Sequence, residues 1–216
     1  MTGDSTLTGA LVGLRDWHLN DLAAYRQWLR PHHEWHAWDG PYFPRPTDAQ
    51  ADEICAQLRR RITAADWPIP RTSLVIADRD SDVLVGSVSW YYESEVTDWR
   101  RIGVVLYDPA SWSGGRGTEA VRLWADYLFS STEIARLDFA TWSGHTAMCA
   151  IGSKFGWTEE ARFRDARVVR GQRYDSVVYG VLRREWLGRP AGLSAHAAIA
   201  VDSVGQCECS RCGAIR

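Results

Sequence analysis

The sequence of 216 residues contains almost no lysine, few cysteines and methionines, and no long apolar run. Lys154 is its one lysine, against 24 arginines. Without a run of about 18 apolar residues, the sequence predicts no membrane-spanning helix and no membrane partner. Residues 1–10 lack the apolar segment of a signal peptide. Five cysteines, an odd number, do not suit the disulfide framework of a secreted domain. These absences favour a cytoplasmic protein.

A strong charge of either sign is also missing. The net charge of -2 at pH 7 gives no reason to expect a nucleic-acid partner. A hydrophobic content of 45% and a charged content of 24% are ordinary for a soluble globular protein, and the length favours one domain. From residue 188 the sequence becomes rich in Ala, Gly and Ser without a sustained period. We therefore predict a folded domain over residues 1–187 and a disordered tail over residues 188–216.

Apolar periodicity, caps and turn residues predict alternating strands and helices along the domain. Strands are expected at residues 10–15, 73–77, 83–92, 102–107, 137–141, 163–169 and 174–182. Helices are expected at residues 21–29, 47–62, 118–130 and 145–155. Because strands cluster in both halves with helices between some of them, the predicted fold class is α/β, a mixed sheet with helices on both faces.

The motif that carries chemistry is a glycine-rich turn at residues 112–117, with the sequence Trp-Ser-Gly-Gly-Arg-Gly. It follows a strand that is apolar on both faces and precedes a predicted helix. Glycines let the backbone approach a ligand closely, and successive free amides at a helix N-terminus favour a phosphate group. The turn is not a P-loop, since no Gly-Lys-Ser/Thr follows, and its glycine spacing differs from that of a dinucleotide fingerprint. A plain strand-to-helix connection is the structural alternative.

This turn resembles motif A of the GNAT acetyltransferases, whose pattern is Gln/Arg-x-x-Gly-x-Gly/Ala. Gly115 and Gly117 match its two small residues, whereas Trp112 stands where the pattern has Gln or Arg. The Thr-Glu-Ala that follows the turn is typical of the RimJ/RimL-like branch. Two later segments, residues 141–157 and 174–182, are similar to the second cofactor region and the last strand of that branch.

The resemblance spans roughly residues 11–186 and implies a GNAT-like fold in which two central strands splay apart, with acetyl-CoA as co-substrate. The strand before the turn is expected to separate from its neighbour after Thr141. Backbone groups of this strand would pair with the pantetheine arm, and amides of the turn would hold the pyrophosphate. The implied cofactor-binding residues are Val105, Leu106, Tyr107, Trp112, Gly114, Gly115, Arg116, Gly117, Thr118 and His145.

Three of these residues also have simpler structural interpretations. Arg116 is expected to add a charge-assisted contact to the pyrophosphate, but a solvated side chain is the alternative. His145 stands where relatives usually have Asn and would meet the pantetheine or adenosine side, although it also suits a helix N-cap. Tyr107 is also consistent with a strand-end aromatic that packs on the core.

Acetyl transfer to an amine needs a base for the amine proton and a donor to the thioester carbonyl, for which the Leu106 amide is the candidate. The Tyr and Ser acids of relatives do not transfer, because their positions hold Gly152 and about Met148. Glu93 and Glu95 end the third predicted strand near the expected acceptor cleft, and Glu93 is the preferred base. Tyr174 is a second-choice acid. A surface carboxylate and a strand aromatic are the alternative interpretations of Glu93 and Tyr174.

The loop at residues 31–46 borders the acceptor site in this fold. Its residues Trp35, Trp38, Asp39 and Tyr42 are predicted to bind the amine, through an apolar wall or cation cage and a carboxylate. A loop pinned to the body by two buried tryptophans is the rival interpretation. The loop also contains three histidines, at 32, 33 and 36, but it lacks the Glu and helical context of a zinc protease motif, so no metal is predicted there.

The sequence thus predicts an N-acetyltransferase that moves an acetyl group from acetyl-CoA to a primary amine, either a protein N-terminus or a small molecule, by direct attack in a ternary complex. A monomer or a homodimer is expected. A non-catalytic acyl-CoA sensor or interaction protein is the alternative. A third hypothesis assigns an interaction role to the tail cysteines, Cys207, Cys209 and Cys212, which also invite a zinc site with His196; unligated thiols are the expected state.

Overall fold

The computed structural model describes residues 7–189, so the predicted tail and its cysteines lie almost entirely outside the described residues. The strands are β1 (Leu7–Thr8), β2 (Val12–Arg15), β3 (Ser73–Asp78), β4 (Leu84–Ser94), β5 (Trp99–Leu106), β6 (Arg136–Trp142), β7 (Thr158–Val169) and β8 (Gln172–Leu182). The α-helices are α1 (Asp21–Trp28), α2 (Asp48–Ala64), α3 (Arg116–Ser131), α4 (Thr146–Lys154) and α5 (Arg183–Leu187), and two 3-10 turns are η1 (Glu34–Ala37) and η2 (Pro109–Ser111).

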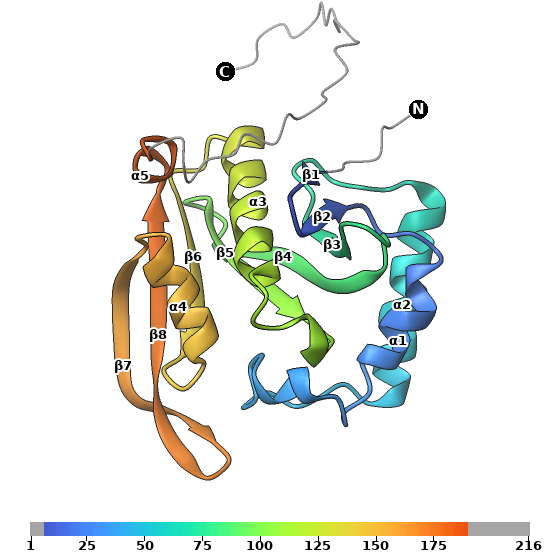
Figure 1. Cartoon of the computed structure of the whole chain (residues 1–216), viewed down its shortest axis with the longest axis horizontal. Helices are drawn as coiled ribbons and strands as arrows, with labels where there is room; N and C mark the ends of the chain where they lie inside the picture. The colour runs from blue at the N-terminus through green and yellow to red at the C-terminus, as the bar shows by residue number, and fades with distance from the viewer. Residues whose placement is uncertain (1–6, 190–216) are drawn as a thin grey trace, which may run out of the picture.

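The strands form one mixed sheet in the order β1-β2-β3-β4-β5-β6-β8-β7. Neighbouring strands are antiparallel except β5 and β6, which run parallel. Figure 1 shows β6, β8 and β7 as one part of the sheet and β1 to β5 as the other, with α3 over the centre. The predicted α/β class with a mixed sheet is confirmed.

Two apolar clusters cover opposite faces of the sheet, as alternation along β3 requires. Leu74 and Ile76 pack in the cluster under α3 and α4, whereas Val75 and Ala77 pack in the cluster under α1 and α2. The apolar face of α3 is buried, with Trp124 fully enclosed and its Nε1 donating to the Ser89 carbonyl (3.0 Å). Helices therefore lie on both faces, as predicted, and α3 is fixed firmly over the sheet centre.

The split between β5 and β6 begins earlier than the sequence suggested. The two strands pair only at Arg100 with Leu137 and at Arg101 with Asp138. Asp138 is fully buried and its carboxylate accepts hydrogen bonds from Arg101 Nε (2.6 Å) and from Trp99 Nε1. Because this carboxylate joins the strands at one level only, they separate just beyond it. The expected separation after Thr141 was therefore placed three residues too late.

Helix α3 begins at Arg116, two residues before the predicted start at Thr118. Gly115 occupies the N-cap position with φ +88°, a left-handed conformation that favours glycine. The preceding Ser113 is also left-handed, with φ +61°. This pair of reversals turns the chain sharply from η2 into α3, so that the glycine-rich turn lies at the mouth of the helix.

Candidate active site

A cavity of about 490 Å³ lies in the split, between the end of β5, the mouth of α3, helix α4 and the segment around η1. Of the residues predicted from the sequence, it is lined by Trp35, Trp38, Asp39, Val105, Leu106, Trp112, Gly115, Gly117, Thr118 and His145. Residues that line it but were missed are Val104, Ser113, Thr146, Ala147, Met148, Ile151 and Lys154. Segments far apart in sequence thus meet at one site.

The mouth of α3 presents unused backbone donors. The first hydrogen bond of the helix runs from the Glu119 amide to the Gly115 carbonyl (2.9 Å). In the described part of the chain, the amides of residues 115–118 donate no hydrogen bond to protein atoms. Such amides, together with the positive end of the helix dipole, make an anion site. Gly117 keeps the approach open, because a Cβ there would lie 3.7 Å from Leu106 and 3.8 Å from Ile151.

The backbone of β5 faces the split at alternate residues. The Tyr107 amide donates to the Val85 carbonyl in β4 (2.9 Å). Since antiparallel pairs alternate, the backbone groups of Val105 also point to β4, whereas those of Val104 and Leu106 point into the split. Val105 and Tyr107 therefore have no backbone groups free for the pantetheine pairing expected of them, whereas the Val104 backbone groups and the Leu106 N–H face the split.

Trp112 stands where the family pattern has Gln or Arg, and its side chain connects two elements of the site. Its indole Nε1 donates to the Leu106 carbonyl (3.0 Å), which ties the end of β5 to the turn before α3. Its ring lines the cavity and meets Trp38 edge-on at 6.5 Å. Trp112 therefore acts on the shape of the site, and it leaves the Leu106 N–H as the free polar group at this level.

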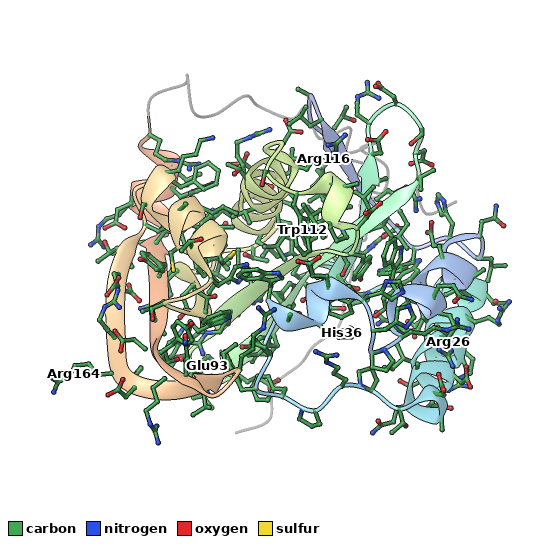
Figure 2. All side chains as sticks on the ribbon, turned by 60° about the horizontal axis from the view of Figure 1, so that its bottom comes forward. Arg26, His36, Glu93, Trp112, Arg116 and Arg164 are labelled. Atoms are coloured by element: carbon green, nitrogen blue, oxygen red, sulfur yellow. The ribbon has the colours of Figure 1, made fainter. Side chains whose placement is uncertain are left out.

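Three predicted cofactor residues do not line the cavity. Arg116 Nη2 forms an ion pair with Asp78 (3.2 Å), which draws its guanidinium toward the end of β3 (Figure 2). The Tyr107 ring is buried and its hydroxyl shares a hydrogen bond with Ser87 Oγ (2.8 Å), so the core-packing interpretation of Tyr107 is the one that fits. Gly114 belongs to the turn but lies outside the lining.

Glu119 holds the mouth of α3 against the N-terminal strands. Its carboxylate accepts hydrogen bonds from the amides of Ala10, Leu11 and Val12 at 2.8, 2.7 and 2.9 Å. This arrangement turns a negative charge away from the anion site and orders the start of the helix. Sequence reasoning noted Glu119 only as part of a family motif, because its partners lie more than 100 residues away.

Helix α4 contributes a neutral histidine and no acid. Burial lowers the pKa of His145 to about 4, and its Nδ1 lies 3.3 Å from Thr141 Oγ1. The imidazole is therefore uncharged at neutral pH. Two turns later, a Cβ on Gly152 would meet the Tyr179 ring at 2.8 Å, so no tyrosine fits there. Met148 lines the cavity without an ionisable group.

The cavity has a cationic end and an anionic end. Lys154, the last residue of α4, lies near the mouth of α3, since Ile151 one turn earlier contacts Gly117. Trp38 lies at the other end of α4, 5.7 Å from the His145 ring. The nine-residue helix separates these ends by about 13 Å. Asp39 is next to Trp38, so its carboxylate marks the second end.

The loop of residues 31–46 fits both interpretations made from the sequence. It is pinned to the body, because Trp35 Nε1 donates to the Trp28 carbonyl (2.8 Å) and Trp142 Nε1 donates to the Trp38 carbonyl (3.1 Å). Trp35, Trp38 and Asp39 nevertheless line the cavity.

One residue of this loop is not at the cavity. Tyr42 lies outside the lining, and the Arg167 guanidinium sits 4.3 Å above its ring. Tyr42 was expected in the acceptor site, but its ring instead contacts Arg167 of β7.

The two side chains expected to move protons lie away from the cavity. Glu93 forms an ion pair with Arg101 (2.8 Å), at the closed end of the split. Figure 2 shows Glu93 well apart from Trp112 and Arg116. The Tyr174 hydroxyl donates to Gln172 (2.9 Å) and its ring packs on Trp142. Neither residue is placed where a reacting amine would lie.

The described residues contain no group of three or more His, Cys, Asp and Glu side chains able to hold a metal ion. His36 is buried, with Nε2 3.1 Å from the Arg30 carbonyl. Within the same residues, no helix combines the length and apolar character needed to cross a membrane.

Comparisons with known proteins agree on one family. The family model described as "Acetyltransferase (GNAT) domain" matches residues 12–158. The "Putative ribosomal N-acetyltransferase YdaF" of Bacillus subtilis is 32% identical over 107 residues, which are 49% of this chain and 57% of that protein. The chain therefore matches little more than half the length of this relative.

Solved structures show the same fold. Spermidine N-acetyltransferase from Vibrio cholerae, in complex with CoA and spermine, has a TM-score of 0.66 at 13% identity, covering 83% of this chain and 99% of that one. RimL, a ribosomal L7/L12 alpha-N-protein acetyltransferase in complex with CoA, has a TM-score of 0.63 at 13% identity, covering 82% and 97%.

Proposed function

Because the chain belongs to the GNAT acetyltransferase family, we propose that it transfers an acetyl group from acetyl-CoA to the nitrogen of a primary amine. The observation that carries the proposal is the cavity at the split, with unused amides at the mouth of α3 and the Leu106 amide facing the gap. Relatives named for ribosomal protein and spermidine acetylation indicate amines as the general class of acceptor.

The residues present fit an acyl-CoA molecule. The amides of residues 115–118 and the Lys154 ammonium offer donors and positive charge for its diphosphate. The backbone groups of Val104 and the N–H of Leu106 offer strand-like pairing for the pantetheine arm. When bound, acetyl-CoA supplies the activated acetyl group as a thioester.

The protein's contribution is to hold the reactants together and to stabilise developing charge. The residues assigned to the two reactants line one cavity, so direct attack in a ternary complex is the mechanism we propose. The Leu106 N–H is placed to donate to the carbonyl oxygen as negative charge develops. No acidic side chain of α4 faces the cavity, and none is required, because a thiol has a reference pKa of about 8.5 and its thiolate leaves readily.

A thiol-release assay with a panel of primary amines tests this function. We expect amine-dependent release of CoA, an acetylated product by mass spectrometry, and intersecting lines in double-reciprocal plots, as a ternary complex requires. CoA binding without turnover on any amine would instead support the non-catalytic sensor. Parallel lines would indicate an acetylated enzyme and would overturn the direct-attack mechanism.

A further inference from the structure

One carboxylate in the cavity wall, that of Asp39, has no hydrogen-bond or ion-pair partner among the described residues. Asp39 lines the cavity next to Trp35 and Trp38, and its backbone N–H donates to the Trp35 carbonyl (3.1 Å), which fixes it at the end of η1. Among the described residues, no side chain or amide donates to its carboxylate. Elsewhere in this arginine-rich chain buried carboxylates are bound by arginine, as Asp138 is by Arg101.

Asp39 is open to solvent at the cavity but has no cation beside it among residues 7–189. Partial loss of hydration raises the pKa of Asp39 above its usual value. Two arginines of the neighbouring segments have other contacts, since Arg167 is engaged with the Tyr42 ring and Arg45 donates to the Pro31 carbonyl.

A carboxylate beside indole rings suits an organic ammonium ion, which gains a charge-assisted hydrogen bond and a cation–π contact. The Trp38 indole Nε1 is buried without an acceptor among the described residues; as a donor it suits an oxygen atom on the body of the acceptor and not the ammonium group. Building on the proposed function, we infer that Asp39 holds the ammonium group of the acceptor against Trp35 and Trp38 and takes its proton. Asp39 thereby fills the role that the sequence had suggested for Glu93.

The step balances in atoms and charge. The ammonium gives one proton to the Asp39 carboxylate, and the neutral nitrogen attacks the thioester carbonyl carbon while the Leu106 N–H donates to the carbonyl oxygen. The C–N bond forms, the C–S bond breaks, and the thiolate takes the second nitrogen proton to become a thiol. Asp39 then releases its proton to solvent through the open mouth of the cavity.

This base limits the class of acceptor. The reference pKa of an α-amino group is about 4 units above that of an aspartate carboxyl, and the reference pKa of a lysine-type amine is about 6.5 units above it. At neutral pH, the neutral and reactive fraction of the α-amine is therefore about 300-fold larger than that of the lysine-type amine. A single carboxylate also gives a polyamine only one anchor in the cavity wall. The inferred acceptor is therefore a primary amine with a pKa near 8, carried on an apolar or aromatic body that packs on Trp35 and Trp38.

Binding is the first test, since it does not depend on turnover. Phenylalanine amide is titrated into CoA-saturated protein at pH 6.5 by calorimetry. We expect wild-type protein to bind it, Asp39→Asn to bind at least about tenfold more weakly, and Glu34→Gln to match wild type. Glu34 is the matched control, because it is an exposed acid at the start of η1, five residues before Asp39 and outside the cavity lining. Equal binding by both variants, or none by wild type, overturns the inference.

Turnover is the second test. Asp39→Asn should lower kcat/KM for phenylalanine amide by about 100-fold at neutral pH, while the affinity for CoA stays within twofold and reports an intact fold. Activity of the variant should recover as pH rises past the amine pKa, and Asp39→Glu should restore part of it. Wild type should prefer phenylalanine amide to Nα-acetyl-lysine amide and spermidine. A pH profile of Asp39→Asn parallel to wild type, or the reverse preference, contradicts the assignment.

The two tests separate the inference from the function on which it rests. If wild type acetylates amines and Asp39→Asn does so equally well, the acetyltransferase function stands and the role of Asp39 falls. If wild type binds CoA and amine but releases no thiol, the acetyltransferase function falls, and the binding comparison alone decides whether Asp39 holds the ammonium.

Discussion

The two ends of the cavity are built from different parts of the chain. The cofactor end consists of backbone amides at the mouth of α3, opened by Gly115 and Gly117. The acceptor end consists of the side chains of Trp35, Trp38 and Asp39, on a loop pinned to the body of the protein. A site whose binding groups are backbone amides tolerates many side-chain substitutions. A site whose binding groups are side chains can change its ligand preference through a single substitution. The fold can therefore keep one cosubstrate while its acceptor varies.

The sharpest test of this contrast is to add a side chain at the cofactor end. Gly117→Val adds a side chain at the cavity wall, in ordinary contact with Leu106 and Ile151. We expect affinity for CoA to fall by at least about 100-fold, since the added methyl groups would take the space of a diphosphate bound to these amides and the lost amide contacts cost about 3 kcal/mol. Thr118→Val keeps its amide and should change the affinity less than about threefold. If both variants lose affinity alike in calorimetry, side chains bind the cofactor and the contrast fails.

His145 lies at the Trp38 end of the cavity, and its titration should appear in the pH dependence of protein stability. Burial depresses its pKa from 6.5 to about 4, so in that window the unfolded chain binds more protons. Stability from this group is complete above pH 6.5 and is lost as pH falls toward 4, by about 3 kcal/mol. The free energy of unfolding is measured in urea at pH 7 and at pH 4. It should fall less between these pH values for His145→Asn than for wild type, by about the same 3 kcal/mol. Equal losses would mean that the imidazole is not held neutral.

The cofactor end should also depend on the support behind it. Glu119→Gln weakens three hydrogen bonds to the amides of residues 10–12. A loss of about 1–2 kcal/mol is expected, or a fall in Tm of about 5 °C, with only a few-fold weaker CoA binding. Glu133→Gln, whose side chain is 95% exposed, is the control and should leave Tm unchanged in a thermal melt. A larger effect on CoA than on Tm would make Glu119 part of the binding site itself.

The smallest effect is expected for the one side-chain charge at the cofactor end. Lys154→Gln should weaken CoA binding by about fivefold at low salt, and the difference from wild type should shrink at higher ionic strength. Arg59→Gln removes the same charge from an exposed position of α2 and should have no effect in the same titration. A loss for Lys154→Gln as large as that for Gly117→Val would contradict a backbone-built site.

The same difference explains what could be predicted from sequence. The order of strands and helices, the mixed sheet and the glycine-rich turn follow from local periodicity and backbone freedom, and the structure has them. Lys154 and Ile151 were missed because only the packing of α4 over the split brings them to the turn.

Glu93 was misplaced for a related reason. Its position at the end of β4 suggested an open cleft, but Arg101 binds it where Asp138 closes the sheet. The register of β4 and β5 decides which residues of β5 turn their backbone groups toward the split. The sequence does not give this register, so it could not show that Val104 faces the split and Val105 faces β4. Asp39 was recognised as an amine partner, but its lack of any arginine partner is visible only in three dimensions.

A crystal structure of the protein with CoA would test the central claim most directly. We predict diphosphate oxygens about 2.8–3.1 Å from the amide nitrogens of residues 115–118, and a thiol that points toward Asp39. A diphosphate bound elsewhere, or a thiol at the Lys154 end of α4, would contradict the account.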